Sequence, residues 1–380
     1  DLMRRVSVRL VERPRQLAEL LVMLVLSAAL LGGEGICAIL FFHWISGLRL
    51  GVDEKNKHGL NVSASSRLGG LAVFMVAIVL IVWGALIDPQ RMAADISRTG
   101  TYHLWFISLI VCALMGLSED LRNNFLTPRV RLISKFAVIA AMAFYWPQII
   151  PTSIGVYGVD FLLQSPLIGL ILVTIFLVGF INAINMADGA NGLVPGVVVC
   201  ATLIFSLQTN RMVDESIFLA FAAFLLFNVI SGRLFLGDMG TYGAGCMLGL
   251  YGLIFFNEGV FSLSFLAALF AYPCLDCLVS ISRRLAAGES AFLPDNNHLH
   301  NRLYFHVAKR LGDGVHANSV TGLLIASCTS GVVLLGYLQN WWPVTSNSWI
   351  VIFIGEILAY ALVLYLCDRA QVVSQHSKTV

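Results

Sequence analysis

Long apolar runs recur along this chain from one end to the other, and they constrain its fold more than any other feature. A helix needs roughly 20 apolar residues to cross a hydrocarbon core about 30 Å thick. Because the runs are distributed along the whole chain, they form the fold itself and do not anchor a separate soluble domain. Only 12% of the residues are charged, against about 25% in soluble domains. The sequence therefore predicts an all-α polytopic membrane protein.

The positions and lengths of the apolar runs predict about eleven transmembrane helices. The expected ranges are 20–47, 68–87, 103–117, 132–147, 166–181, 193–208, 216–230, 243–256, 261–281, 319–338 and 349–367. No internal repeat or long linker divides the chain, so residues 1–380 are interpreted as one domain. Within it, residues 1–19 form a basic tail and residues 282–318 a long loop.

Positive charge is distributed unequally between the two sides of the predicted bundle. Connections after odd-numbered spans hold fourteen Lys and Arg residues, and those after even-numbered spans hold three. The richer side is normally cytoplasmic, so the odd connections are expected there. An odd number of spans would then leave the arginine-rich tail outside, which conflicts with the same rule. Alternatively, Gly32-Gly-Glu-Gly35 breaks the first run into two short segments that return the tail to the cytoplasm.

Polar residues able to perform chemistry are concentrated in the odd connections. They form five patches, at Asp53–His58 with Arg67, at Glu119-Asp120, at Asn182–Gly192, at Gly237–Gly240 and at Pro294–Arg302. An Asp at a helix centre costs about 2.5–3.5 kcal/mol on insertion scales, so these acids must face water, cations or each other. Carboxylates without thiolate ligands favour a hard cation such as Mg²⁺. A magnesium site in turn suggests a phosphorylated substrate.

Each patch has a plainer explanation when it is taken alone. Adjacent acids at a helix end are most often solvated, Gly-Asp-Met-Gly is often a turn, and a His-Leu-His pair is usually an ordinary loop. These explanations do not account for five patches on one membrane face. The pattern therefore indicates a single site at the cytoplasmic surface. With a net charge of +2 and no polybasic tract, nucleic acid is not expected as a partner.

The order and spacing of these patches resemble the bacterial polyprenyl-phosphate N-acetylhexosamine-1-phosphate transferases, within glycosyl transferase family 4. That family includes the enzymes that start O-antigen, enterobacterial common antigen and teichoic acid synthesis. The most specific similarities are those of Asn182-Ala-x-Asn-x-x-Asp-Gly-x-x-Gly-Leu193 to NAxNxxDGxxGL and of Phe235-x-Gly-Asp-x-Gly-Thr241 to FxGDxGS. Further similarities to PxxD, RR and PDxxHxHH lie at Pro273-x-x-Asp276, Arg283-Arg284 and Pro294-Asp295-x-x-His298-x-His300.

Three positions depart from the family pattern. Glu119 stands where the family's acidic pair has its first Asp, Asn191 replaces the second Asp of DGxDG, and Asn301 replaces the last His of HxHH. The change from Asp to Glu keeps the charge, whereas Asn191 keeps hydrogen bonding and loses the charge. The reaction class is expected to be retained, while the sugar preference is left open.

The resemblance implies a reaction and a setting for it. A UDP-linked N-acetylated sugar in the cytoplasm would react with undecaprenyl phosphate in the bacterial plasma membrane, among membrane lipids, and release UMP. The product would start a cell-envelope polysaccharide such as O-antigen. The resemblance also implies Mg²⁺, or alternatively Mn²⁺, as cofactor. It leaves open which sugar is used and whether two chains associate as a homodimer.

The resemblance further implies roles for individual residues. Asp238 would be the principal metal ligand and Asp120 the second, while Asp120 with Glu119 would orient or deprotonate the lipid phosphate. Asp188, with Asn182 and Asn185, would hold the nucleotide. The other expected substrate-binding residues are basic groups that meet phosphates and an acid that orients one of them, namely Lys55, Lys57, Arg67, His298, His300, Arg302 and Asp276.

Other functions are weighed against this one. A transporter is the main alternative, because multispan proteins with polar midplane residues are often carriers, but here the polar residues lie at helix ends on one face. The CDP-alcohol phosphotransferases carry DGxxAR, and Asp188-Gly-Ala-Asn-Gly-Leu does not match it. The eukaryotic dolichol enzyme is a closer relative, and the His298-x-His300 loop favours the bacterial type.

Overall fold

The computed structural model describes residues 2–48, 51, 65–99, 103–122, 125–290 and 297–376. Within these residues the regular elements are helices, together with one isolated bridge between Ser66 and Leu234, so the predicted all-α class is confirmed. The helices are α1 Leu2–Gly47, α2 Gly69–Ile87, α3 Pro89–Thr99, α4 His103–Leu121, α5 Pro128–Tyr145, α6 Tyr157–Leu163, α7 Pro166–Ala187, α8 Leu193–Thr209, α9 Met212–Ser231, α10 Gly237–Asn257, α11 Leu263–Leu269, α12 Ala271–Ala286, α13 Leu299–Leu311, α14 Val315–Cys328, α15 Ser330–Leu338 and α16 Ile350–His376, with 3₁₀ turns at Pro147–Ile149 and Asn347–Trp349.

The number of membrane spans is lower than the sequence suggests. A helix covers each of the eleven expected ranges, but among the described residues six helices are long and apolar enough to cross a membrane, or up to eight if each of two bent pairs counts as one span. Helix α8 has 17 residues, about 26 Å at 1.5 Å per residue, and α5 carries Arg129, Arg131 and Lys135. The predicted count of about eleven is not confirmed. The expected loop over 282–318 also contains a helix, α13.

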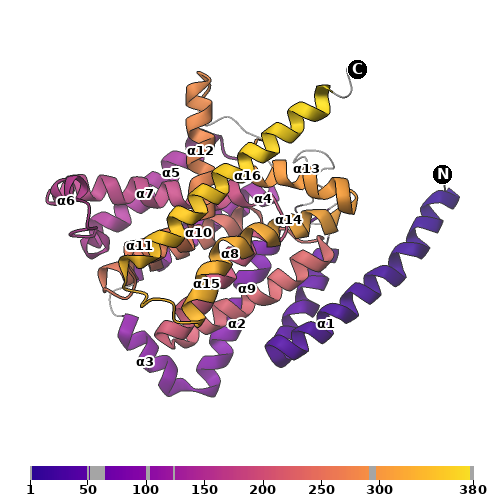
Figure 1. Ribbon diagram of the computed structural model, residues 1–380. Helices are drawn as coiled ribbons and strands as arrows, with labels where there is room; N and C mark the ends of the chain where they lie inside the picture. The colour runs from indigo at the N-terminus through magenta and orange to yellow at the C-terminus, as the bar shows by residue number, and fades with distance from the viewer. Residues whose placement is uncertain are drawn as a thin grey trace.

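Helix α1 doubles back on itself at Gly32, where the backbone has φ 68° and ψ −155°. Glu19 and His43 lie 24 positions apart, which is about 36 Å in a straight helix. Both interact electrostatically with Arg233, so the two halves of α1 must return to the same end of the bundle. Figure 1 shows α1 descending from the N-terminus and turning at its lower end. The interpretation of two short segments is therefore correct, and the basic tail lies at the end of the bundle where α1 finishes.

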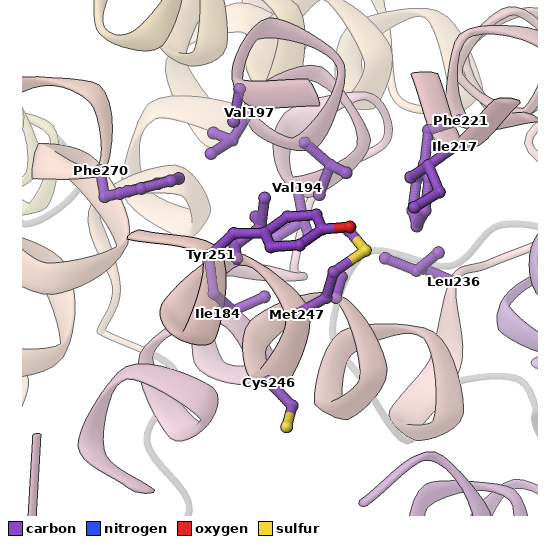
Figure 2. Packing of buried hydrophobic residues seen from close by; sticks show 14 of the residues in the cluster. Ile184, Val194, Val197, Ile217, Phe221, Leu236, Cys246, Met247, Tyr251 and Phe270 are labelled. Carbon is purple, nitrogen blue, oxygen red and sulfur yellow. The ribbon is translucent and has the colours of Figure 1, made fainter. Parts of the chain in front are cut away.

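Helix α10 forms the centre of the bundle, and its side chains from Met239 to Phe255 are nearly all buried. Gly245 allows this packing, because an added Cβ would lie 2.9 Å from Ile181 Cα of α7. Figure 2 shows Met247 of α10 in the surrounding apolar cluster, which includes Val194 of α8. Close packing along its length fixes the position of α10. The first residues of α10 are those of the predicted Gly-Asp motif.

Candidate functional site

The first turn of α10 is held by Asp120, near the end of α4. Asp238 N–H donates to Asp120 Oδ1 and Met239 N–H donates to Asp120 Oδ2, each at 2.8 Å. A carboxylate in this position satisfies N–H groups that have no partner within the helix. Gly116 allows α4 to approach, since an added Cβ would lie 2.3 Å from the Asp238 carbonyl. Asp120 thus holds the backbone that carries Asp238.

The segment around Arg67 pairs with the chain just before α10. Gly69 N–H donates to the Phe235 carbonyl at 2.9 Å, and Gly70 N–H donates to the Leu236 carbonyl at 2.7 Å. Gly237 has φ +70°, and an added Cβ would lie 2.2 Å from the Arg67 carbonyl oxygen. A side chain at this position is excluded both by the backbone angle and by the contact. The pairing brings the Arg67 segment to the same end of the bundle as Asp238.

The end of α7 supplies an amide and a carboxylate beside Asp238. Asn185 Nδ2 donates to Asp238 Oδ1 and to Thr241 Oγ1, each at 2.8 Å. Asp188, the residue directly after α7, has its pKa raised to about 7, first by burial and then by the negative charge of Asp238, while Arg67 opposes the shift. Charged groups from two distant segments, Asp238 and Arg67, therefore act on the Asp188 carboxyl group.

Helix α5 contributes two basic side chains that the sequence analysis missed as site residues. Arg131 Nη1 lies 3.7 Å from Glu119 Oε2 and 3.8 Å from Asp238 Oδ2. Lys135 is fully buried, donates from Nζ to Asn182 Oδ1 and lies 3.9 Å from the centre of the Tyr242 ring. The available signal was the spacing of four residues, which places Arg131 and Lys135 on one helical face.

The two histidines of the His-x-His motif are held at the start of α13. His298 Nδ1 lies 2.6 Å from Asp276 Oδ2, and the His298 and His300 rings are stacked with their centroids 5.3 Å apart. His300 Nδ1 lies 3.0 Å from the Tyr272 hydroxyl. Its Nε2 faces Gly189, where an added Cβ would lie 2.0 Å away. The histidine pair therefore contacts the turn that carries Asp188.

Burial determines the charge of His300. Burial is the main cause that lowers the pKa of His300 to about 4; the charge of Asp276 opposes this shift and that of His298 adds to it. His300 is therefore neutral near pH 7. A neutral imidazole has one donor and one acceptor nitrogen. His300 can therefore donate one hydrogen bond and accept another, and it carries no positive charge.

Three of the predicted substrate-binding residues are not placed beside these carboxylates. Lys55 and Lys57 lie outside the described residues. Arg302 forms an ion pair with Asp368 of α16, and its Nε donates to the Asn297 carbonyl at 3.2 Å. Asn191, at the position of an aspartate in the resembled family, is buried and forms its hydrogen bonds away from these carboxylates. Its backbone N–H donates to Asn318 Oδ1 and its side chain donates to Ser319, both on α14.

The donor set bears on whether a metal ion could bind. The described part of the chain holds no group of three or more His, Cys, Asp or Glu side chains arranged for a metal. Mg²⁺, however, keeps several waters and is usually bound by one or two carboxylates together with substrate phosphates. Asp188 and Asp238 repel each other and offer such oxygens, so this pair fits Mg²⁺. Asp120 fits less well because both of its oxygens accept backbone hydrogen bonds.

Fold and site together define a multispan membrane protein whose acids, amides and basic groups converge at one end of the helix bundle. A sequence model described as glycosyl transferase family 4 matches residues 102–256. Over these residues the chain is similar to that family.

Relatives of this chain carry related names. An undecaprenyl-phosphate alpha-N-acetylglucosaminyl 1-phosphate transferase from Thermotoga maritima is 26% identical over 250 residues, 66% of this chain and 70% of that protein. A decaprenyl-phosphate N-acetylglucosaminephosphotransferase from Mycobacterium tuberculosis is 28% identical over 284 residues, 67% of this chain and 69% of that protein. A phospho-N-acetylmuramoyl-pentapeptide-transferase from Latilactobacillus sakei is 25% identical over 256 residues, 60% of this chain and 73% of that protein.

Proposed function

We propose that this protein transfers N-acetylhexosamine 1-phosphate from a UDP-sugar to undecaprenyl phosphate and releases UMP. The names of the relatives support a polyprenyl phosphate acceptor and a sugar-phosphate donor. The observation that carries the proposal is the meeting of Asp188, Asp238, Arg131 and Lys135 at one end of a membrane bundle. Such a site offers charges of both signs to two phosphate-bearing substrates, one of which is a lipid.

In this reaction an oxygen of the lipid phosphate attacks the phosphorus that carries the sugar. The bond from that phosphorus to the oxygen bridging it to UMP breaks, and UMP leaves with the electron pair. Both substrates are anions, and two unit charges 4 Å apart repel by about 4 kcal/mol at an effective dielectric constant of 20. Arg131 and Lys135 supply fixed positive charge against this repulsion. The acceptor phosphate is already largely ionised at neutral pH, so positioning and charge carry most of the catalysis.

The carboxylates have separate roles in this proposal. Mg²⁺, or alternatively Mn²⁺, would be held by Asp238 and Asp188 and would neutralise phosphate charge. Asp120 is a positioning residue, because both of its oxygens hold the first turn of α10. Glu119 Oε1 accepts from Leu126 N–H and its Oε2 faces Arg131, so it orients that guanidinium. This assignment replaces the expectations that Asp120, with Glu119, orients or deprotonates the lipid phosphate and that Asp120 is a metal ligand.

The histidine motif would bind the donor. With Nδ1 of His298 directed to Asp276, its Nε2 is the nitrogen left to contact a phosphate oxygen. His300 supports the turn at Gly189, beside Asp188. Asn182 and Asn185 keep Lys135 and Asp238 in place.

The proposed site faces the cytoplasm of a bacterium from the plasma membrane. The support is the excess of Lys and Arg, fourteen against three, in the connections that the sequence predicts to be cytoplasmic, which also carry the site residues. The folding back of α1 removes the conflict with the basic tail, because the tail then lies at that same end.

The test is a donor panel. Purified protein, undecaprenyl phosphate and Mg²⁺ are incubated with a set of UDP-sugars, and UMP release is measured. We expect release with an N-acetylhexosamine donor, a loss of more than tenfold in Asp238→Asn, and wild-type rates in Asp313→Asn, whose carboxylate is exposed at the end of α13. Sugar uptake by proteoliposomes without UMP release would instead establish a transporter.

A further inference from the structure

The carboxylate of Asp276 takes part in three hydrogen bonds. Leu299 N–H donates to Oδ1 at 3.0 Å, the Tyr360 hydroxyl donates to Oδ1 at 2.9 Å, and His298 Nδ1 lies 2.6 Å from Oδ2. Asp276 is 1% exposed. A buried carboxylate needs such donors, and its orientation is set by them. Two of the donors belong to the histidine motif and the third to α16.

We propose that Tyr360, on the C-terminal helix α16, is a positioning residue that sets the orientation of His298 through Asp276. This inference rests on the proposed function, since His298 is there the phosphate contact. The family sequence model ends at residue 256, 104 positions before Tyr360, so the match does not cover this helix.

The contacts continue from Asp276 to the carboxylate site. His298 stacks on His300, and His300 faces Gly189, the residue after Asp188. A change at Asp276 therefore reaches the turn that carries Asp188 through two packed rings. An imidazole held at one nitrogen by a carboxylate has a fixed ring orientation and a fixed tautomer. Tyr360 contributes a second hydrogen bond to Oδ1, beside that of Leu299 N–H, and so helps to hold the carboxylate with Oδ2 directed to His298.

Tyr360 can be altered without removing its ring. The Tyr272 and Tyr360 rings pack with centroids 6.2 Å apart, and phenylalanine retains this contact. Tyr365 lies on the same helix but is 52% exposed, with the Arg369 guanidinium 5.1 Å from its ring centre. Tyr365→Phe thus removes a hydroxyl from α16 without touching Asp276, and it serves as the matched control.

The experiment compares UMP release by Tyr360→Phe, Tyr365→Phe, His298→Ala and the double variant Tyr360→Phe with His298→Ala. Because a hydrogen bond to a charged group contributes more free energy than one between neutral groups, we expect Tyr360→Phe to lower kcat by roughly tenfold or more. We expect Tyr365→Phe to leave kcat unchanged. In the His298→Ala background, Tyr360→Phe should cost nothing further, because the residue through which it acts is gone.

The same variants are also compared for UMP affinity, from the rise in melting temperature that UMP produces. This binding measurement allows the single and double variants to be compared even where His298→Ala has no measurable turnover. We expect Tyr360→Phe to weaken UMP binding only when His298 is present. Equal turnover and equal UMP affinity in Tyr360→Phe and Tyr365→Phe would overturn the inference, and so would an undiminished effect of Tyr360→Phe in the His298→Ala background. A wild-type protein that releases no UMP from any donor would instead contradict the proposed function.

Discussion

At the scale of single residues, the site depends on a contact that permits no side chain. Gly189 faces His300 Nε2 so closely that an added Cβ would lie 2.0 Å away. We expect Gly189→Ala to displace His300 or the Asp188 turn and to lower turnover by roughly 100-fold, as misplacement of a site group by about 1 Å does elsewhere. Gly179→Ala is the control, because an added Cβ there meets nothing within 4 Å. Equal rates of UMP release in the two variants would contradict the contact.

The Asp188 carboxyl predicts a dependence of stability on pH. Its pKa is about 7 in the folded protein against an ordinary 3.8, so the folded state binds this proton more tightly than the unfolded state. The stabilisation is complete below about pH 4 and is lost as pH rises through about 7. In EDTA, the melting temperature should therefore fall between about pH 5 and about pH 8, and it should fall less in Asp188→Asn. Parallel curves for the two proteins would show that Asp188 does not titrate in this way.

Magnesium should oppose this fall of the melting temperature with rising pH. A divalent cation competes with the proton for Asp188, so Mg²⁺ should raise the melting temperature of the wild-type protein more at about pH 8 than at about pH 6. Asp313→Asn, which removes an exposed carboxylate, should behave like the wild type. An equal effect of Mg²⁺ on the wild type and on Asp188→Asn would remove this carboxylate from the metal site.

The sequence predicted the acids of the site better than their partners. Asp188, Asp238 and Asp276 stand in motifs with fixed local spacing, so they could be found along the chain. The two N–H groups that Asp120 accepts from lie 118 and 119 residues away, and no local pattern reports them. Lys135 was counted only as a cytoplasmic charge, because a buried lysine is recognised by its tertiary contacts.

At the scale of elements, apolar runs located the helices but not which of them cross the membrane. Helix α8 is short and lies inside the bundle, and the apolar run at 261–281 is two helices bent by 76°. Hydropathy reports whether a residue prefers an apolar environment and does not report the direction of the helix axis. A bend inside an apolar run therefore cannot be recognised from hydropathy. At Gly32 a glycine cluster gave that signal, and the structure uses it to fold α1 back.

The first turn of α10 gives a prediction about stability. Asp120→Asn replaces one acceptor oxygen by an amide N–H that faces a backbone N–H, so we expect a loss of about 1–3 kcal/mol in the free energy of unfolding and lower turnover. Asp88→Asn is the comparison, because Asp88 accepts a single bond from Arg91 N–H at an exposed helix start, where asparagine serves nearly as well. Thermal unfolding in detergent measures both. A loss no larger in Asp120→Asn than in Asp88→Asn would show that Asp120 does not hold α10.

At the scale of the whole molecule, the arrangement explains why scattered motifs can form one site. Helices α4 and α7 both pack against α10, and Asp120, Asn185 and Asp238 lie at the same end of these helices. The remainder of each helix faces the apolar core or lipid. The acids and basic groups of the site thus lie together at one end of these helices, so that few of them have to be buried in the middle of the membrane.

This polarity predicts which residues face the same side of the membrane. In a background with the eight cysteines replaced, Gln16→Cys on α1 and Glu289→Cys after α12 should react together with a membrane-impermeant maleimide in inside-out vesicles, because the folding back of α1 brings both to the end that holds the site. Tyr157→Cys, 90% exposed on α6 at the other end, should react in right-side-out vesicles. Reaction of Gln16→Cys together with Tyr157→Cys would mean that α1 crosses the membrane once. Reaction of Glu289→Cys from outside would contradict a cytoplasmic site, since the positive charges that favour that orientation lie at the same end.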